Sequence, residues 1–183
     1  MISLATTDPV DLLAALLLED GTPWGAVAQP IQRADAAAIL DPHGPRQHYL
    51  TRPRGGSKST DAAAVLLVVL LTQAPPESVS HLYAADAEQA ALILSKVRGL
   101  AERTGLGGLL HFRAREVTVK ESAARLRVEP ADAPSAYGHT PYFVILDEAA
   151  AWPDTENYRT LRRAIFSGLT NRPDSRLVVL TSA

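Results

Sequence analysis

Hydrophobic positions occur in runs that distinguish buried helices from buried strands. Residues 62–71 consist only of Ala, Val and Leu, so a helix there would be apolar on every side, as expected of one packed against a sheet. Residues 142–146 read YFVIL, an unbroken apolar run typical of a strand in the centre of a parallel sheet. Residues 176–180 predict a second buried strand. These segments indicate a sheet flanked by helices.

The other predicted elements are bounded by polar caps, Gly or Pro. Predicted helices cover residues 9–19, 32–40, 59 to the residues before Pro75, 86–103 and 155–167. Further predicted strands cover residues 47–51, 78–84, 117–120 and 125–128, with turns or loops at 22–25, 42–46 and 131–140. This alternation predicts a single α/β domain over residues 1–183, a three-layer sandwich with a mostly parallel central sheet and an N-terminal helix within residues 1–21.

Composition narrows the classes of function. The absence of cysteine excludes disulfides, thiolate metal sites and a cysteine nucleophile. A formal net charge of −2 gives no global electrostatic case for nucleic-acid binding, so such a partner would need a local basic patch. The apolar run 12–18 has acidic flanks, unlike a secretory signal, and residues 62–71 are too few to span a bilayer. We expect a soluble intracellular protein.

Residues 52–61, RPRGGSKSTD, have the character of a loop that wraps phosphates. Gly55 and Gly56 permit close backbone approach, and the start of the following helix presents N–H groups to an anion. Lys58 is expected to reach the outer phosphates of a polyphosphate. The Ser59 hydroxyl is expected to bind Mg²⁺, and Thr60 is a weaker candidate for the same site. The loop therefore predicts nucleotide binding.

The loop departs from the usual pattern at two positions. Arg52 and Ser57 stand where the consensus has glycine, six residues and one residue before Lys58. On this segment alone, the alternative is a solvated turn rich in glycine, serine and basic residues. A second motif is needed to choose between the two interpretations.

Asp147 and Glu148 supply that second motif. They follow the apolar strand 142–146, at the edge where α/β sheets bind ligands. In nucleotide hydrolases such a pair divides the work: Asp147 would hold Mg²⁺ through water and Glu148 would activate the attacking water. The alternative is a pair of acids that merely favours the start of a helix. Together with the loop at Lys58, the pair favours ATP hydrolysis. Thr181 and Ser182 at a third strand end fit a sensor of the γ-phosphate or, alternatively, a strand end capped by hydroxyl residues.

With these motifs in place, the sequence resembles the ATPase domain of the large terminase subunit of tailed bacteriophages, the motor that packages DNA into capsids. The resemblance covers roughly residues 22–183. It is carried by residues 53–60, 82–86, 88–90, 144–148 and 181–182. It implies a P-loop NTPase fold with ATP and Mg²⁺ as ligands.

The resemblance also assigns roles to individual residues. It implies that Arg54 contacts the γ-phosphate region, Glu148 is the catalytic base, and Thr181 and Ser182 couple hydrolysis to DNA movement. Gln32 resembles the glutamine that reads adenine in this family, although a glutamine at a helix start is also a common surface residue. The implied nucleotide-binding set is Gln32, Gly55, Gly56, Ser57, Lys58, Ser59, Thr60, Asp147, Thr181 and Ser182.

The family implies partners as well. These are double-stranded DNA, the phage portal, the small terminase subunit and further copies in a ring, in the cytoplasm of a phage-infected or prophage-carrying bacterium. The C-terminal nuclease domain of the family has no counterpart in residues 1–183, so we expect no DNA cleavage. Two alternatives remain: a catalytically silent nucleotide-binding or assembly module, and another P-loop ATPase acting on DNA, such as a helicase.

The basic side chains and histidines outside these motifs do not point to a further functional site. Arg159, Arg162 and Arg163 share the face of the predicted helix 155–167 opposite its apolar side, which indicates a solvated surface or, alternatively, a contact with DNA or a neighbouring subunit. The histidines show no spacing typical of metal ligands. We therefore expect no metal beyond nucleotide-bound Mg²⁺.

Overall fold

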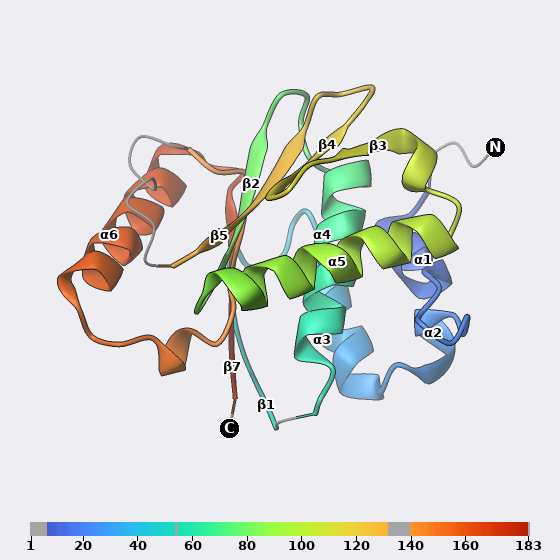
Figure 1. Cartoon of the computed structure of the whole chain (residues 1–183), viewed down its shortest axis with the longest axis horizontal. Helices are drawn as coiled ribbons and strands as arrows, with labels where there is room; N and C mark the ends of the chain where they lie inside the picture. Colours follow the sequence, from blue (N-terminus) through green and yellow to red (C-terminus); the bar gives the residue numbers. More distant parts are fainter. Residues whose placement is uncertain (1–6, 54, 132–139, 183) are drawn as a thin grey trace.

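A computed structural model describes residues 7–53, 55–131 and 140–182. Within these ranges one sheet of seven strands has the order β1-β7-β6-β2-β5-β4-β3. The pairs β1·β7, β7·β6, β6·β2 and β2·β5 are parallel, whereas β4 pairs antiparallel with β5 and with β3 (Figure 1). The strands are β1 (Gln47–Arg52), β2 (Val79–Ala84), β3 (Leu110–Phe112), β4 (Glu116–Val119), β5 (Arg125–Pro130), β6 (Phe143–Leu146) and β7 (Arg176–Ser182).

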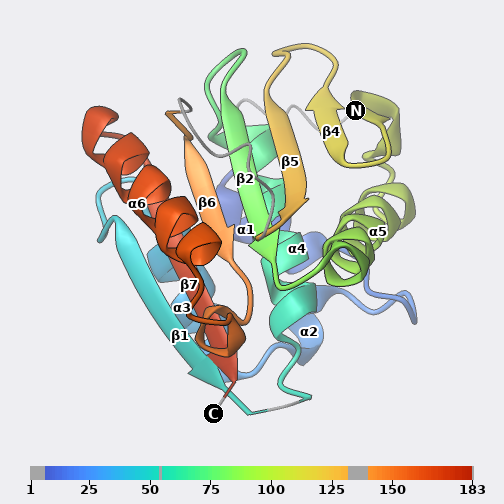
Figure 2. The ribbon, with the colours of Figure 1, turned by 60° about the vertical axis from the view of Figure 1, so that its left-hand side comes forward.

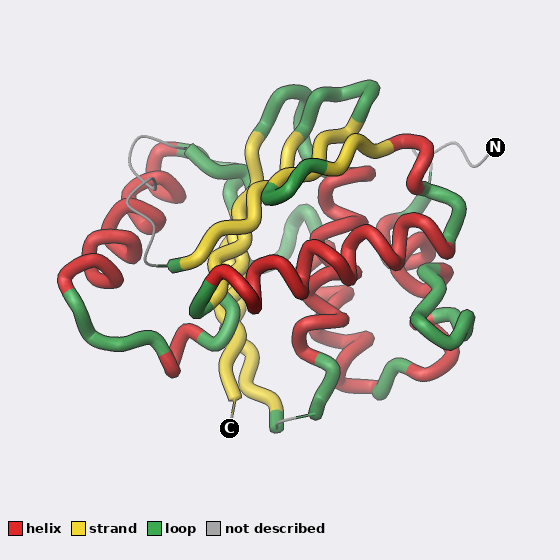
Figure 3. Tube along the Cα trace, in the orientation of Figure 1, coloured by secondary structure: helices red, strands yellow, loops and turns green. Residues whose placement is uncertain are grey.

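Helices cover both faces of the sheet and complete three layers (Figures 1 and 3). One face carries α1 (Pro9–Ala15), α2 (Trp24–Val27), α3 (Pro30–Leu40), α4 (Lys58–Thr72) and α5 (Ala87–Arg103). The other carries α6 (Glu156–Asn171), which crosses the strands in Figure 2. The 3-10 helices are η2 (Gly107–Leu109) and η4 (Ala149–Ala151). The predicted three-layer α/β fold with a mostly parallel sheet is confirmed.

The two cores follow from the apolar pattern. Residues 62–70 of α4 are all buried between the sheet and the outer helices, as the run of Ala, Val and Leu predicts. On the other face Leu161, Ile165 and Leu169 of α6 pack against the sheet, which leaves the polar side of α6 outward. Among the described residues, every helix is too short or too polar to cross a bilayer.

The strand register brings the motifs to one edge of the sheet. Thr51 of β1 lies opposite Thr181 of β7, and Leu146 of β6 lies opposite Val179. Since these three strands are parallel, their carboxyl ends point to the same side (Figure 2). The phosphate loop follows β1, and the acidic pair follows β6, so the fold places both motifs at this edge.

Two local predictions are wrong. The first helix ends at Ala15 rather than at residue 19, because Leu16 is extended and its carbonyl accepts a hydrogen bond from Trp24 N (2.8 Å). Trp24 in turn begins α2 and is not part of a turn over residues 22–25. This tertiary contact overrides the helical propensity of the leucine-rich run.

The sequence prediction also misses one strand and ends one helix too early. The missed strand is β3, since a segment of three residues shows no periodicity. Helix α6 continues to Asn171, beyond the predicted end at residue 167. The predicted loop at residues 131–140 lies largely outside the described residues.

Candidate nucleotide-binding site

The phosphate loop connects β1 to α4 by a backbone that uses left-handed conformations. Gly55 has φ 79° and Ser57 has φ 57° with ψ 17°. The Ser57 side chain makes no hydrogen bond to the N–H groups of the first turn of α4. A helix start without a side-chain cap can bind an anion through these N–H groups. Arg54, the predicted γ-phosphate contact, lies outside the described residues.

Lys58 is the point where the predicted motifs meet. Its Nζ lies 2.9 Å from Glu148 Oε1 and donates to Ser182 Oγ, and it also donates to the carbonyl of Arg52 at 3.4 Å. Its side chain is only 8 % exposed. The structure therefore brings together Lys58 from the loop, Glu148 after β6 and Ser182 at the end of β7.

Ser182 holds Glu148 in place. Its backbone N donates to Glu148 Oε2 at 2.9 Å and its Oγ donates to Oε1 at 2.7 Å. Glu148 itself has φ 51° and ψ 38°, a left-handed conformation that is uncommon outside glycine. Burial alone would raise the pKa of Glu148, but the contacts with Ser182 and Lys58 outweigh it and lower this pKa. The carboxylate is thus ionised at neutral pH.

Asp147 has the opposite electrostatic character. It is 3 % exposed, and its Oδ1 has no hydrogen-bond partner among the described residues. Burial, reinforced by the negative charge of Glu148 and opposed by Lys58, raises the pKa of Asp147 to about 6. A buried carboxylate oxygen without a donor is suited to a cation or its water shell, so Asp147 fits the predicted Mg²⁺ role.

An open cleft of about 760 Å³ is lined by Lys58, Glu148 and Ser182, whereas Asp147 lies outside its lining. This volume is within the usual range for a cofactor site. Three regions line it: the phosphate loop with the start of α4, the ends of β6 and β7, and helix α5. The predicted site residues in its lining are Gly55, Gly56, Ser57, Lys58, Ser59, Thr60, Glu148, Thr181 and Ser182.

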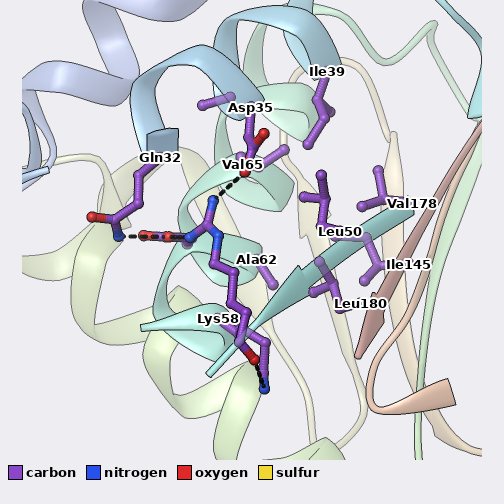
Figure 4. A pocket seen from close by; sticks show the side chains of 13 residues that line it. Gln32, Asp35, Ile39, Leu50, Lys58, Ala62, Val65, Ile145, Val178 and Leu180 are labelled. Carbon is purple, nitrogen blue, oxygen red and sulfur yellow. Dashed lines mark hydrogen bonds and ion pairs between the residues drawn. The ribbon is translucent and has the colours of Figure 1, made fainter. Parts of the chain in front are cut away.

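A buried polar network that the sequence analysis misses lies behind the loop. Asp61, in the first turn of α4, accepts hydrogen bonds from Trp24 Nε1 (2.9 Å) and Gln32 Nε2 (2.7 Å) and forms an ion pair with Arg52. Arg52 also pairs with Asp35 Oδ2 at 2.8 Å (Figure 4). An acidic residue directly before the apolar run of α4 is the available signal in the sequence. Its partners cannot be read from spacing.

This network determines where Gln32 lies. The Gln32 Oε1 accepts from the backbone N of Gln29 (2.8 Å), so the side chain caps its own helix while its amide nitrogen reaches Asp61. Gln32 lines a cavity of about 20 Å³ beside the open cleft, and Lys58 lines both spaces (Figure 4). Arg52 stands at one of the positions where the consensus has glycine. Its side chain, paired with Asp35 and Asp61, forms part of the wall of this cavity.

The arginines of α6 are exposed and lie outside the lining of the cleft. Arg159 forms a bidentate pair with Asp154 (2.7 and 2.6 Å), and Arg163 lies 3.3 Å from Glu156. Arg162 lines a groove of about 410 Å³ between α6 and the sheet. These positions agree with an exposed face of α6. Among the described residues, His, Cys, Asp and Glu form no group of three that could hold a metal ion.

Comparison with known proteins agrees with this geometry. The family model described as "Terminase large subunit, ATPase domain" matches residues 45–183, which include all the motifs of the cleft, and it confirms the resemblance drawn from them. No curated protein sequence matches.

Solved structures share the fold. The large terminase of bacteriophage HK97 superposes with a TM-score of 0.80 at 18 % identity over 95 % of this chain and 37 % of that chain. The large terminase ATPase domain of Thermus phage P74-26 gives 0.63 at 22 % identity over 80 % and 63 %. A large terminase from a thermophilic bacteriophage gives 0.62 at 10 % identity over 84 % and 39 %. The chain thus spans between about a third and two thirds of these proteins.

Proposed function

The chain belongs to the terminase large subunit ATPase domain family, and on this premise we propose that it hydrolyses ATP to drive the movement of double-stranded DNA. The observation that carries the proposal is the convergence of Lys58, Glu148 and Ser182 at the mouth of the cleft. The network brings a cation suited to phosphates close to an ionised carboxylate suited to activating water, and hydrolysis of ATP uses both kinds of group.

The roles follow from position and charge. Lys58 and the N–H groups at the start of α4 would bind the phosphates, with Arg54 as a further γ-phosphate contact. Ser59 and Asp147 would hold Mg²⁺, which neutralises charge on the phosphate oxygens when it is bound. Glu148 would accept a proton from the water that attacks the γ-phosphorus while the bond from that phosphorus to the ADP oxygen breaks.

The pairing of Lys58 with Glu148 adds a requirement to this scheme. The ammonium of Lys58 neutralises the carboxylate that is proposed to act as the base. A triphosphate competes for the same ammonium, so its binding would release Glu148 toward water. Ser182, which contacts both groups, would sense this exchange and, with Thr181, pass it to the rest of the motor.

The remaining assignments are extensions of the same proposal. Gln32 would read adenine, which requires its amide to leave Asp61 or Gln29 N. The proposed partners are double-stranded DNA, the phage portal, the small terminase subunit and further copies of the chain in a ring, in the cytoplasm of the bacterial host. The proposed activity of these residues is ATP hydrolysis alone.

A phosphate-release assay combined with calorimetry tests the proposal. We expect the wild-type chain to bind ATP in the presence of Mg²⁺ and to release phosphate, with release increased by double-stranded DNA. Binding without release at every protein concentration, with and without DNA, would favour the silent module. Release stimulated by single-stranded nucleic acid, together with strand separation, would favour a helicase.

A further inference from the structure

Helix α5 brings a second lysine to the nucleotide cleft. Lys96 lines the cleft together with the phosphate loop and Glu148. Its Nζ donates to Thr60 Oγ1 at 3.1 Å, so the ammonium lies beside the first turn of α4. No motif in the sequence includes this residue, which is one of several charged side chains in the amphipathic helix α5. Only the packing of α5 on α4 reveals its position.

The charge of Lys96 is weakly compensated within the described part of the chain. Its carboxylate neighbour, Glu19, lies 3.8 Å away and has an 81 % exposed side chain, whereas the Lys96 side chain is 24 % exposed. Such a pair at the surface contributes little. Lys58, by contrast, has Glu148, Ser182 and the Arg52 carbonyl around its ammonium. An ammonium has three donors, and Thr60 takes one of those of Lys96.

The position of Lys96 in the cleft determines which part of a nucleotide it faces. Glu148 and Ser182 bound the side of Lys58 where the γ-phosphate must lie for hydrolysis. Lys96 extends from helix α5 and contacts the start of α4 at Thr60. In a phosphate loop the lysine reaches the β- and γ-phosphates, while the backbone N–H groups cradle the α- and β-phosphates, so a cation beside Thr60 is placed toward the nucleoside end of the phosphate chain.

From this geometry we propose that Lys96 is a nucleotide-binding residue that contacts the α-phosphate. The proposal deepens the function proposed above and rests on it. An ammonium donating to a phosphate oxygen forms a charge-assisted hydrogen bond, which is stronger than a bond between neutral groups. Because ADP and ATP share the α-phosphate, both lose the same contact when the charge is removed.

Calorimetric titration with Mg·ADP and with Mg·ATPγS tests this assignment. We expect Lys96→Met to raise the Kd of both nucleotides by the same factor, roughly tenfold at low salt, because one charge-assisted hydrogen bond is lost. Lys96→Arg should restore most of the affinity, and the loss should shrink as KCl screens the charge. Lys120→Met is the matched control, since Lys120 donates to the Gly108 carbonyl and lies outside the lining of the cleft.

Two further variants separate the possible failures. An unchanged Kd in Lys96→Met, or a loss for ATPγS but not for ADP, would overturn the assignment of Lys96. If adding Lys96→Met to Thr60→Val caused no further loss of affinity, the assignment would also be overturned, because Lys96 would then act only through Thr60. Absence of binding by the wild-type chain would overturn the proposed function and the assignment together. Lys96→Gln provides the same comparison if Lys96→Met does not fold.

Discussion

The ammonium of Lys58 lies 2.9 Å from Oε1 of Glu148, so the proposed phosphate-binding cation is neutralised by the carboxylate proposed to activate water. This contact joins two segments that are far apart in the sequence. Under the proposed roles, nucleotide binding and activation of the base depend on the same pair.

Replacing Glu148 by Gln should separate binding from hydrolysis. The amide keeps the size and can still contact Ser182, but it neither neutralises Lys58 nor accepts a proton. We expect nucleotide affinity to be kept or to increase a few fold, and phosphate release to fall by roughly 10²–10⁴-fold because the general base is lost. Calorimetry and single-turnover phosphate release measure the two effects. Glu156→Gln, on the exposed face of α6, is the control and should change neither.

Phosphate release by Glu148→Gln at the wild-type rate would remove Glu148 from the base role. Lys58→Ala completes the comparison. It should weaken nucleotide binding by roughly 10²-fold or more, since a charge-assisted contact is lost and the Glu148 carboxylate is left to repel the phosphates.

Ser57 occupies a left-handed position that glycine adopts without strain. With φ 57°, it carries a side chain in a conformation that costs L-residues roughly 1–2 kcal/mol, offset by the greater flexibility of an unfolded glycine. We expect Ser57→Gly to raise the free energy of unfolding by about 0.5–1 kcal/mol, measured by urea denaturation. Gly55→Ala, at φ 79° with open space around its Cβ, should lower it through backbone strain alone.

Ala123 offers a control for this substitution outside the cleft. It has φ 56° and lies between β4 and β5. Ala123→Gly should stabilise the chain to a similar extent without changing nucleotide affinity, whereas Ser57→Gly changes the phosphate loop itself. A loss of stability in Ser57→Gly would show that its hydroxyl or loop rigidity outweighs the strain.

The parts of the fold that the sequence predicts are those set by local pattern. The apolar runs of α4 and β6 and the Asp86 cap of α5 are each recognisable within one segment, and the structure contains all three. The phosphate loop and the acidic pair are recognisable for the same reason. Their convergence also follows, because parallel strands bring their carboxyl ends to one edge.

The parts that the sequence does not predict depend on contacts between distant segments. The end of α1 is set by the Leu16–Trp24 hydrogen bond, not by a helix breaker. The two hydrogen-bond donors to Asp61 on other helices, Trp24 and Gln32, lie 37 and 29 residues away in the sequence. No spacing rule relates residues on three helices, so the network and the placement of Lys96 appear only in the folded chain.

Asp147 predicts a pH-dependent stability. Its pKa is raised from 3.8 to about 6, so the folded chain binds a proton more tightly than the unfolded chain. Its favourable contribution is therefore fully present below pH 3.8 and is lost as the pH rises through about 6. Asp147→Asn removes this dependence. In EDTA, the variant should be more stable than the wild type at pH 7 by about 2–3 kcal/mol, and the difference should shrink toward pH 4.

Urea denaturation at several pH values measures that difference. The same substitution should weaken the stabilisation of the nucleotide-bound chain by Mg²⁺, because the side chain loses the negative charge proposed to attract the cation and keeps only a neutral amide oxygen. A stability difference that stays constant from pH 4 to pH 7 would contradict the raised pKa.

Asp61 predicts a larger loss of stability than the substitutions above. Its carboxylate joins α2, α3, β1 and α4 through Trp24, Gln32 and Arg52. Asp61→Ala leaves the buried Arg52 with Asp35 as its remaining described carboxylate, and breaking a buried ion pair in this way costs about 3–5 kcal/mol. Trp24→Phe removes one hydrogen bond and retains most of the packing, so it should cost about 1–2 kcal/mol.

The comparison between these two variants decides what the network does. If Asp61 anchors Arg52, the loss in Asp61→Ala should far exceed that in Trp24→Phe, and Asp61→Asn should fall between them because it keeps the hydrogen bond but not the charge. Since Arg52 also supplies its carbonyl to Lys58, Asp61→Ala should further weaken nucleotide binding at temperatures where the chain is still folded. Equal costs for Asp61→Ala and Trp24→Phe would show that the ion pair contributes no net stability and that packing around the indole holds the helices together.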